Sequence, residues 1–210
     1  MPPLPRFDVA SLVPSGRDFL QAVRTARKGL ALVPCLGAED AAREALRMAE
    51  ADVTAIAMSE PGHAMAEAAA AIRLPVLSLA LVSSKEEALA ARAFGADAVM
   101  MDPGATDAER EAAANSVRST RMVALNVART RADVEREAAR GAKVVVVEAA
   151  DLKTLGELAA AAGRLLVIAW PSRPLEDDVR SLRGQVDAVV VGVEVYGATG
   201  FERLVSELNP

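Results

Sequence analysis

At 210 residues, with 52% hydrophobic but only 3% aromatic content, the chain is long enough to bury a core built mainly of Ala, Val and Leu. Its net charge of −5, without a basic cluster interleaved with aromatic residues, argues against nucleic acid as a partner. The lone Cys35 excludes an internal disulfide, and the lack of a signal-like start or of an apolar run of about 20 residues predicts a cytoplasmic protein with no membrane partner.

The first predicted unit is a short N-terminal lead-in, residues 1–27, which covers the bottom of a main domain formed by residues 28–210. The main domain repeats one pattern along the chain. In one series of segments a basic residue precedes an apolar strand, starting at Lys28, Arg73, Arg121 and Arg164. In the second series, which alternates with the first, a charged residue stands shortly before the strand. These charged residues, Asp52, Asp97, Lys143 and Asp187, are 44 to 46 positions apart.

Ala-, Glu-, Arg- and Leu-rich segments separate these eight strands, and several begin with the Asp, Ser or Thr of a helix cap. Continuous apolar strands indicate a sheet buried on both faces, as in parallel sheets covered by helices. The predicted fold class is therefore α/β, a single compact (β/α)8 TIM barrel. A doubly wound open sheet is the alternative, but nothing in that architecture requires eight even repeats.

Three stretches resemble indole-3-glycerol-phosphate synthase, a lyase of tryptophan biosynthesis that acts on an anthranilate-derived ribulose phosphate. They are LPVLSLALVSSKEEALAARAFGADAVMM from Leu74, VVVVEAADLKTL from Val144 and PLEDDVRSLRGQVDAVVVG from Pro174. The likeness extends over about residues 28–208, and DLKT, Asp151 to Thr154, is its most particular part. The resemblance implies a barrel that binds a phosphorylated small molecule.

The catalytic groups of that family are missing from the matching positions. The family has Glu and Lys on the first strand, where this chain has Leu32 and Pro34. It has Lys on the third strand and Glu on the fifth, where this chain has Leu79 and Asn126. It has Asn on the sixth strand and Glu-Ser-Gly after the seventh, where this chain has Glu148 or Ala149 and Trp170-Pro171-Ser172. Only Gly192, which matches the glycine near the phosphate after strand eight, is retained. Leu and Pro cannot transfer a proton, so the resemblance implies a frame without the family's chemistry.

A local resemblance concerns the first strand. The stretch VPCLGAEDAAREA looks like the opening strand of phosphoribosylanthranilate isomerase, in which a catalytic cysteine precedes a glycine. It implies a general-base role for Cys35. The alternative is a small cysteine buried at a strand end.

The site of such a barrel lies at the carboxyl ends of its strands, which defines the remaining candidates. Weak catalytic candidates are Glu148, Glu194, His63 and Cys35, and candidate ligand-binding residues are Gly192, Gly197, Ser172, Arg173, Trp170 and Asn126. Glu148, Arg173 and Glu194 are expected to form an ion-pair network. His63 is either an acid-base group or an exposed polar residue at a helix start. Spacing for a metal site is lacking, and no cofactor is expected.

Two further features leave alternatives open. Trp170 and Tyr196 form either an aromatic wall for a ligand or, as we favour, a plug of the barrel mouth. The glycines of GATG, Gly197 to Gly200, either bind phosphate through backbone N–H groups or end a loop.

The sequence favours a catalytically degenerate synthase-like barrel with a binding, scaffold or regulatory role, in which another protein or a second copy is a further possible partner. The alternative is an active lyase or isomerase that acts on a phosphorylated sugar or anthranilate-type substrate with other residues. A working synthase with a shifted alignment is the third reading, and Leu79 argues against it.

Overall fold

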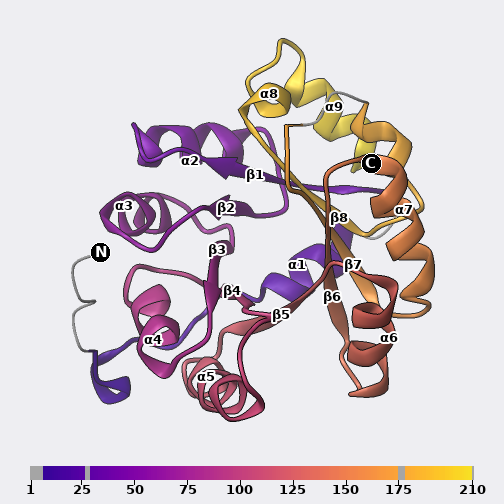
Figure 1. Cartoon of the computed structure of the whole chain (residues 1–210). Helices are drawn as coiled ribbons and strands as arrows, with labels where there is room; N and C mark the ends of the chain where they lie inside the picture. Colours follow the sequence, from indigo (N-terminus) through magenta and orange to yellow (C-terminus); the bar gives the residue numbers. More distant parts are fainter. Residues whose placement is uncertain (1–6, 27–28, 175–177, 210) are drawn as a thin grey trace.

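The computed structural model describes residues 7–26, 29–174 and 178–209, and its eight parallel strands form a closed barrel in chain order, β1 to β8 (Figure 1). The predicted barrel is confirmed, and the open-sheet alternative is wrong. Every one of the eight predicted apolar segments supplies a strand. The strands are β1 Ala31–Leu36, β2 Ile56–Met58, β3 Val76–Val82, β4 Ala98–Met101, β5 Val123–Ala128, β6 Val144–Ala149, β7 Leu166–Pro171 and β8 Ala188–Val191.

Helices surround the strands on the outside (Figure 1). They are α2 Ala41–Glu50, α3 His63–Ala71, α4 Lys85–Ala93, α5 Asp107–Ser119, α6 Arg131–Ala139, α7 Leu152–Ala161 and α9 Phe201–Leu208. Two details differ from the prediction. The described part of the segment after β7 forms only a 3-10 turn, η3 Val179–Leu182, which Gly184 soon follows in the left-handed conformation. A short additional helix, α8 Val193–Tyr196, stands between β8 and α9.

Polar caps fix where several helices begin. The side chains of Ser84, Thr106 and Thr130 each accept a hydrogen bond from the backbone N–H of the third helical residue. The carboxylate of that third residue accepts in turn from the backbone N–H of the cap, which completes a capping box. Asp151 caps α7 in the same position by accepting from Thr154 N. The DLKT stretch, the most particular part of the family resemblance, therefore acts here as a helix start.

The strands alternate between two hydrophobic clusters, one on each face of the sheet. The outer cluster packs against the helices and includes Leu32, Val145 and Val189. The inner cluster fills the barrel with residues such as Leu77, Leu79, Met100, Leu125, Ile168 and Val190. Because successive residues of a strand point to opposite faces, cluster membership decides which side chains reach the barrel mouth.

The N-terminal segment contributes to the interior of the barrel. It contains η1 Val9–Ser11 and α1 Phe19–Thr25, and α1 lies within the ring of strands in the view of Figure 1. Phe19 and Val23 are fully buried in the inner cluster. The predicted boundary between residues 27 and 28 lies outside the described residues.

Two of the repeated aspartates connect neighbouring strands at their amino ends. Asp97, just before β4, accepts a hydrogen bond from Val76 N at the start of β3 over 2.9 Å. Asp187, just before β8, accepts from Val167 N of β7 over 2.8 Å. In (β/α)8 barrels the amino ends of the strands contribute to stability, whereas the active site lies at the carboxyl ends. Asp97 and Asp187 therefore have a structural function.

Candidate binding pocket at the barrel mouth

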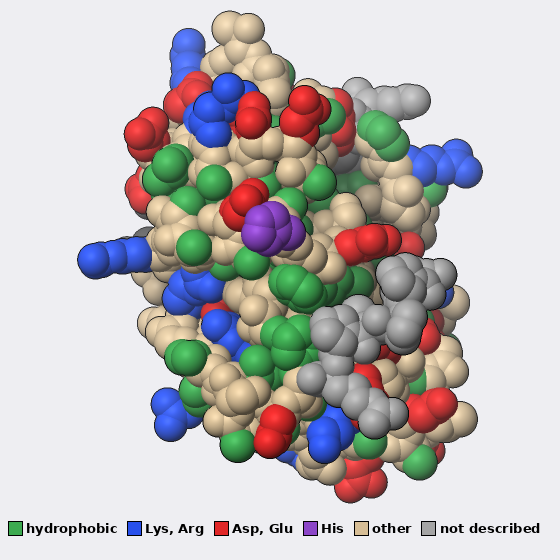
Figure 2. All heavy atoms as spheres, turned by 90° about the vertical axis from the view of Figure 1, so that its left-hand side faces the viewer, with side chains coloured by type: hydrophobic (Ala, Val, Ile, Leu, Met, Phe, Trp, Pro, Cys, Tyr) green, Lys and Arg blue, Asp and Glu red, His purple; other side chains and the backbone are tan. Residues whose placement is uncertain are grey.

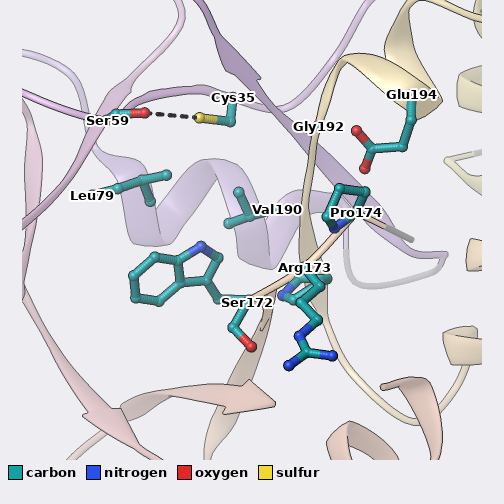
Figure 3. A pocket seen from close by; sticks show the side chains of 11 residues that line it. Cys35, Ser59, Leu79, Ser172, Arg173, Pro174, Val190, Gly192 and Glu194 are labelled. Carbon is teal, nitrogen blue, oxygen red and sulfur yellow. Dashed lines mark hydrogen bonds between the residues drawn. The ribbon is translucent and has the colours of Figure 1, made fainter. Parts of the chain in front are cut away.

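A pocket of about 340 Å³ lies at the carboxyl ends of β1, β2, β3, β7 and β8 (Figure 3). Strand ends and the loops after β7 and β8 contribute its walls. Its lining consists of Cys35, Ser59, Leu79, Trp170, Pro171, Ser172, Arg173, Pro174, Val190, Gly192 and Glu194. The position is the one where barrels of this architecture build their sites.

Cys35 and Ser59 face each other across the ends of β1 and β2, with Sγ and Oγ 3.8 Å apart (Figure 3). Burial raises the pKa of the Cys35 thiol, the nearby Glu194 carboxylate raises it further, and the hydrogen bond with Ser59 opposes both. A thiol with a raised pKa is protonated at neutral pH, and a protonated thiol cannot accept a proton. Burial and the nearby carboxylate therefore favour the protonated form of the Cys35 thiol, and its role as a general base stays a prediction.

Leu79 lies where the resemblance places a catalytic lysine. It belongs to the inner cluster, lines the pocket and is 8% exposed. The register of β3 against β4 shifts between Ser78 and Leu81, so the strand is irregular at this point. The pocket therefore has an apolar wall on its β3 side.

Three positions aligned with catalytic residues point away from the mouth. Leu32 lies in the outer cluster, and Pro34 shares its face by strand alternation. Asn126 also faces outward, because its Nδ2 donates to Oε2 of Glu137 on α6 over 2.7 Å. A one-residue offset exchanges the two faces of a strand, which explains why sequence matching misplaced these residues.

Asn126 is therefore not among the residues that line the mouth pocket, where we expected it to lie. It lines a separate cleft of about 610 Å³ between α5 and α6. There Glu137 is only 3% exposed, and Arg140 and Arg110 approach its Oε1 to 3.1 and 3.7 Å. The Asn126 amide is thus one of the groups that bind the buried Glu137 carboxylate on the outer side of the barrel.

Glu148 has a different partner from the one predicted. Its Oε2 lies 2.7 Å from Nε of Arg129, and its side chain is 15% exposed. Arg173 turns its guanidinium away from the carboxylate of Glu194 (Figure 3). The expected network through Arg173 is therefore replaced by a Glu148–Arg129 pair at the ends of β5 and β6.

His63 stands at the surface, at the first residue of α3. Its side chain is 90% exposed, and its Nε2 lies 3.2 Å from Oε1 of Glu67 one turn later. Figure 2 shows this histidine, the only one in the chain, beside an acidic side chain on the molecular surface. It is not among the residues that line the pocket, and its catalytic role stays a prediction.

Trp170 and Tyr196, which we expected to form one aromatic wall or plug, lie in different surroundings. Tyr196 is buried, edge-to-face with Phe201 at 6.5 Å between ring centroids and under the guanidinium of Arg47 at 5.9 Å. Trp170 lines the pocket and packs against the inner cluster. A pocket persists beside Trp170, so the favoured plug interpretation is wrong and Trp170 forms part of a wall.

The expected phosphate position holds a carboxylate. A β-carbon added at Gly192 would lie 2.2 Å from Oε2 and 2.8 Å from Cδ of Glu194, so this carboxylate lies against the glycine. A β-carbon at Gly197 would lie 2.5 Å from the Val193 carbonyl oxygen, and Gly200 has a φ of 90° at the start of α9. The glycines of GATG are thus required by the loop geometry itself.

Sequence reasoning missed two lining residues, Val190 and Pro174. Val190 could have been found, because strand alternation places every second residue of β8 inside the barrel. In the described ranges, no group of three or more His, Cys, Asp or Glu side chains could hold a metal ion. No helix within those ranges is long and apolar enough to cross a membrane.

The closed parallel barrel defines a (β/α)8 barrel protein with an open pocket at the carboxyl ends of its strands. The sequence matches no protein-family model, and no curated protein matches it significantly. Solved structures share the fold. Thiamine phosphate pyrophosphorylase from Pyrococcus furiosus is 18% identical with a TM-score of 0.58, over 87% of this chain and 95% of that one. A 4-hydroxy-2-oxoglutarate aldolase/2-deydro-3-deoxyphosphogluconate aldolase from TTHB1 is 21% identical with a TM-score of 0.65, over 93% and 100%.

Proposed function

We propose that this barrel binds a small molecule at its mouth without the proton-transfer chemistry of a synthase. The observation that carries the proposal is the lining of the pocket. Among the described lining residues, the ionisable side chains are Cys35, Arg173 and Glu194, and the β3, β7 and β8 walls are Leu79, Trp170 and Val190. The synthase that the sequence resembles uses lysine and glutamate side chains for proton transfer, and among the described lining residues there is no lysine and Glu194 is the one carboxylate.

Covalent catalysis through an imine is not supported either. That mechanism needs a lysine amine against a carbonyl substrate. Lys85, Lys143 and Lys153, the lysines within the described ranges, are absent from the pocket lining. Binding without chemistry is therefore the function that these residues fit best.

A second candidate is an enzyme that acts on a phosphorylated sugar or anthranilate-type substrate with new residues. The open pocket favours it, as do the names of the two structural neighbours, which are those of enzymes. In that case Glu194 is the carboxylate in position to act, because it lines the pocket whereas Glu148 does not. A scaffold or regulatory role with another protein, or with a second copy of the chain, needs no pocket at all.

Trp170 provides the test, since it is the only tryptophan in the chain and lines the pocket. Its fluorescence is titrated with the synthase substrate, carboxyphenylamino-deoxyribulose phosphate, while indole product is followed in the same cuvette. Saturable quenching without product supports a binding barrel, and product formation contradicts it in favour of an enzyme.

A Val190→Phe variant, which fills the pocket from β8, serves as the matched control because it keeps Trp170 and should lose the quenching. Quenching that persists in this variant would place the ligand elsewhere. No response from either protein would overturn the small-molecule proposal and leave a protein partner as the subject of study.

A further inference from the structure

We propose that the ligand of the mouth pocket is elongated, and that its apolar tail passes Ser59 into a second pocket over the end of β3. The inference rests on the proposed binding function and specifies the class of ligand, an amphiphile with an unbranched alkyl chain. It follows from the wall that the two pockets share and from the apolar lining of the second one.

The second pocket adjoins the mouth pocket. It has a volume of about 310 Å³ and lies between the loop after β2, the end of β3 and α4. Ser59, whose hydroxyl faces the Cys35 thiol in the mouth pocket, lines both pockets. Leu79 lines the mouth pocket, and the next two residues of β3, Ala80 and Leu81, line the second one. A ligand that lies against Leu79 and Ser59 is therefore at the border of the second pocket.

The irregular end of β3 directs the second pocket outward from the barrel mouth. The register of β3 against β4 shifts between Ser78 and Leu81. Leu81 is half-buried and packs against the inner cluster, whereas Val82 belongs to the outer cluster, and both line the second pocket. The pocket thus extends from the inside of the barrel toward the helices. A chain that enters it avoids the barrel interior, which side chains such as Leu77 and Met100 fill.

The walls of the second pocket suit a hydrocarbon chain. They are formed mostly by Pro61, Ala80, Leu81, Val82 and Ala90. Burial of a chain against such walls is favourable in proportion to the apolar area removed from water. The second pocket therefore rewards length in an unbranched tail.

Two carboxylates also border the second pocket, and neither makes it a site for a charged group. Glu60 is exposed to solvent. Oε2 of Glu87 accepts hydrogen bonds from the backbone N–H groups of Ser83 and Ser84 and from the Ser83 hydroxyl, over 2.8 to 3.0 Å. This carboxylate thus already caps the start of α4. The apolar walls are left to determine what the pocket binds.

The polar end of the ligand stays in the mouth pocket. Figure 3 shows Ser59 and Leu79 on one side of that pocket and Arg173 on the other. The Arg173 guanidinium offers hydrogen-bond donors to a head group. A ligand with its head on the Arg173 side has its tail toward Leu79 and Ser59, which is the side of the second pocket.

The test uses butyl, hexyl and octyl phosphate, three ligands with one head group and tails of increasing length. Each is titrated against the fluorescence of Trp170, which lines the mouth pocket. We expect each added methylene to tighten binding about threefold, the gain typical of a buried CH₂ group. Octyl phosphate should then bind about a hundredfold more tightly than butyl phosphate. This series needs no substitution.

Ala80→Leu fills the second pocket from β3 and should weaken the binding of octyl phosphate about tenfold. Butyl phosphate, which fits within the mouth pocket, should bind this variant as it binds the wild type, and its binding shows that the variant is folded. Ala124→Leu is the matched control. Ala124 is also a half-buried strand alanine, but it lies on β5 and lines the cleft between α5 and α6. It should bind the whole series as the wild type does.

An equal loss of octyl phosphate binding in both variants would reflect a general disturbance of the barrel and overturn the inference. Butyl and octyl phosphate that bind the wild type equally well would overturn the tail and leave the binding function standing. No response to any of the three ligands also overturns the inference. In that case the proposed function is judged separately, by the titration with the synthase substrate.

Discussion

The carboxylate of Glu194 rests on Gly192, where any side chain would place a β-carbon 2.2 Å from Oε2. The glycine has an extended backbone with φ of −83°, so a non-glycine residue meets no backbone strain there. Only the Glu194 carboxylate therefore leaves no room for a side chain at position 192.

Gly192→Ala should displace the Glu194 carboxylate at little cost in stability, because Glu194 is an exposed side chain and the three heavy atoms nearest the added β-carbon all belong to it. We expect the free energy of unfolding to change by less than about 1 kcal/mol. Urea unfolding of Gly192→Ala beside the wild type measures the change. A much larger loss of stability would show that more than the Glu194 carboxylate fills the space beside this glycine.

Cys35 should react slowly with iodoacetamide, since only the thiolate reacts and the pKa of this thiol is raised by burial and by Glu194. At pH 8 its rate should be below that of N-acetylcysteine, and it should keep rising at pH values where the free thiol has reached its plateau. Glu194→Gln removes one of the two causes and should accelerate the reaction at pH 8 about two- to fivefold. A rate equal to that of N-acetylcysteine would contradict the burial of the thiol.

Asp97→Asn should destabilise the protein strongly. Asp97 is fully buried, with Nε of Arg17 2.7 Å and Nη1 of Arg92 2.9 Å from its oxygens, and Ser15 Oγ donates to it over 2.6 Å. Loss of the charge leaves two guanidinium groups without their carboxylate, at a cost of about 3 kcal/mol or more. Urea unfolding measures the change.

Asp52→Asn is the matched control, because Asp52 holds the equivalent place in the repeat but is exposed. Its φ of 59° is also a conformation that Asn adopts readily. A comparable loss in both variants would show that the buried ion pairs are not the cause.

Ser78→Ala should leave stability unchanged or raise it by about 1 kcal/mol. The Ser78 hydroxyl is fully buried, and its oxygen has no hydrogen-bond partner. Removal of an unsatisfied polar group avoids its desolvation cost. Ser15→Ala is the comparison: its buried hydroxyl donates to Asp97, so the same substitution should cost about 1–3 kcal/mol. Thermal unfolding should therefore show a lower midpoint for Ser15→Ala and an unchanged or higher midpoint for Ser78→Ala. A lower midpoint for Ser78→Ala would contradict the lack of a partner for this hydroxyl.

Acid should weaken the start of α4 through Glu87. Burial raises the pKa of this carboxyl, but hydrogen bonds from Ser83 and Ser84 outweigh it and hold the pKa below its ordinary value. A lowered pKa in the folded state contributes stability that is complete above the unfolded value of about 4.3 and is lost as pH falls through the folded value. Glu87→Gln should thus flatten the decline in stability below about pH 5. Glu86→Gln, one exposed residue earlier, should keep the decline of the wild type.

The barrel was predictable because its signals are local and repeated. Each strand is an apolar run, and caps such as Ser84 and Asp151 mark helix starts within a few residues. The turn after β7 was not, since η3 depends on how Asp178 and Gly184 shape the chain rather than on helix-forming composition.

The sequence by itself determined the eightfold alternation, the absence of a lysine at Leu79 and the retention of Gly192, because residue identity and order decide them. Only the tertiary structure decided which face each side chain occupies. It sent Asn126 outward to Glu137, paired Glu148 with Arg129 and laid Glu194 on Gly192. The physical reason is the two-residue period of a strand, in which a shift of one position exchanges inside and outside, together with loop conformations that no local pattern fixes.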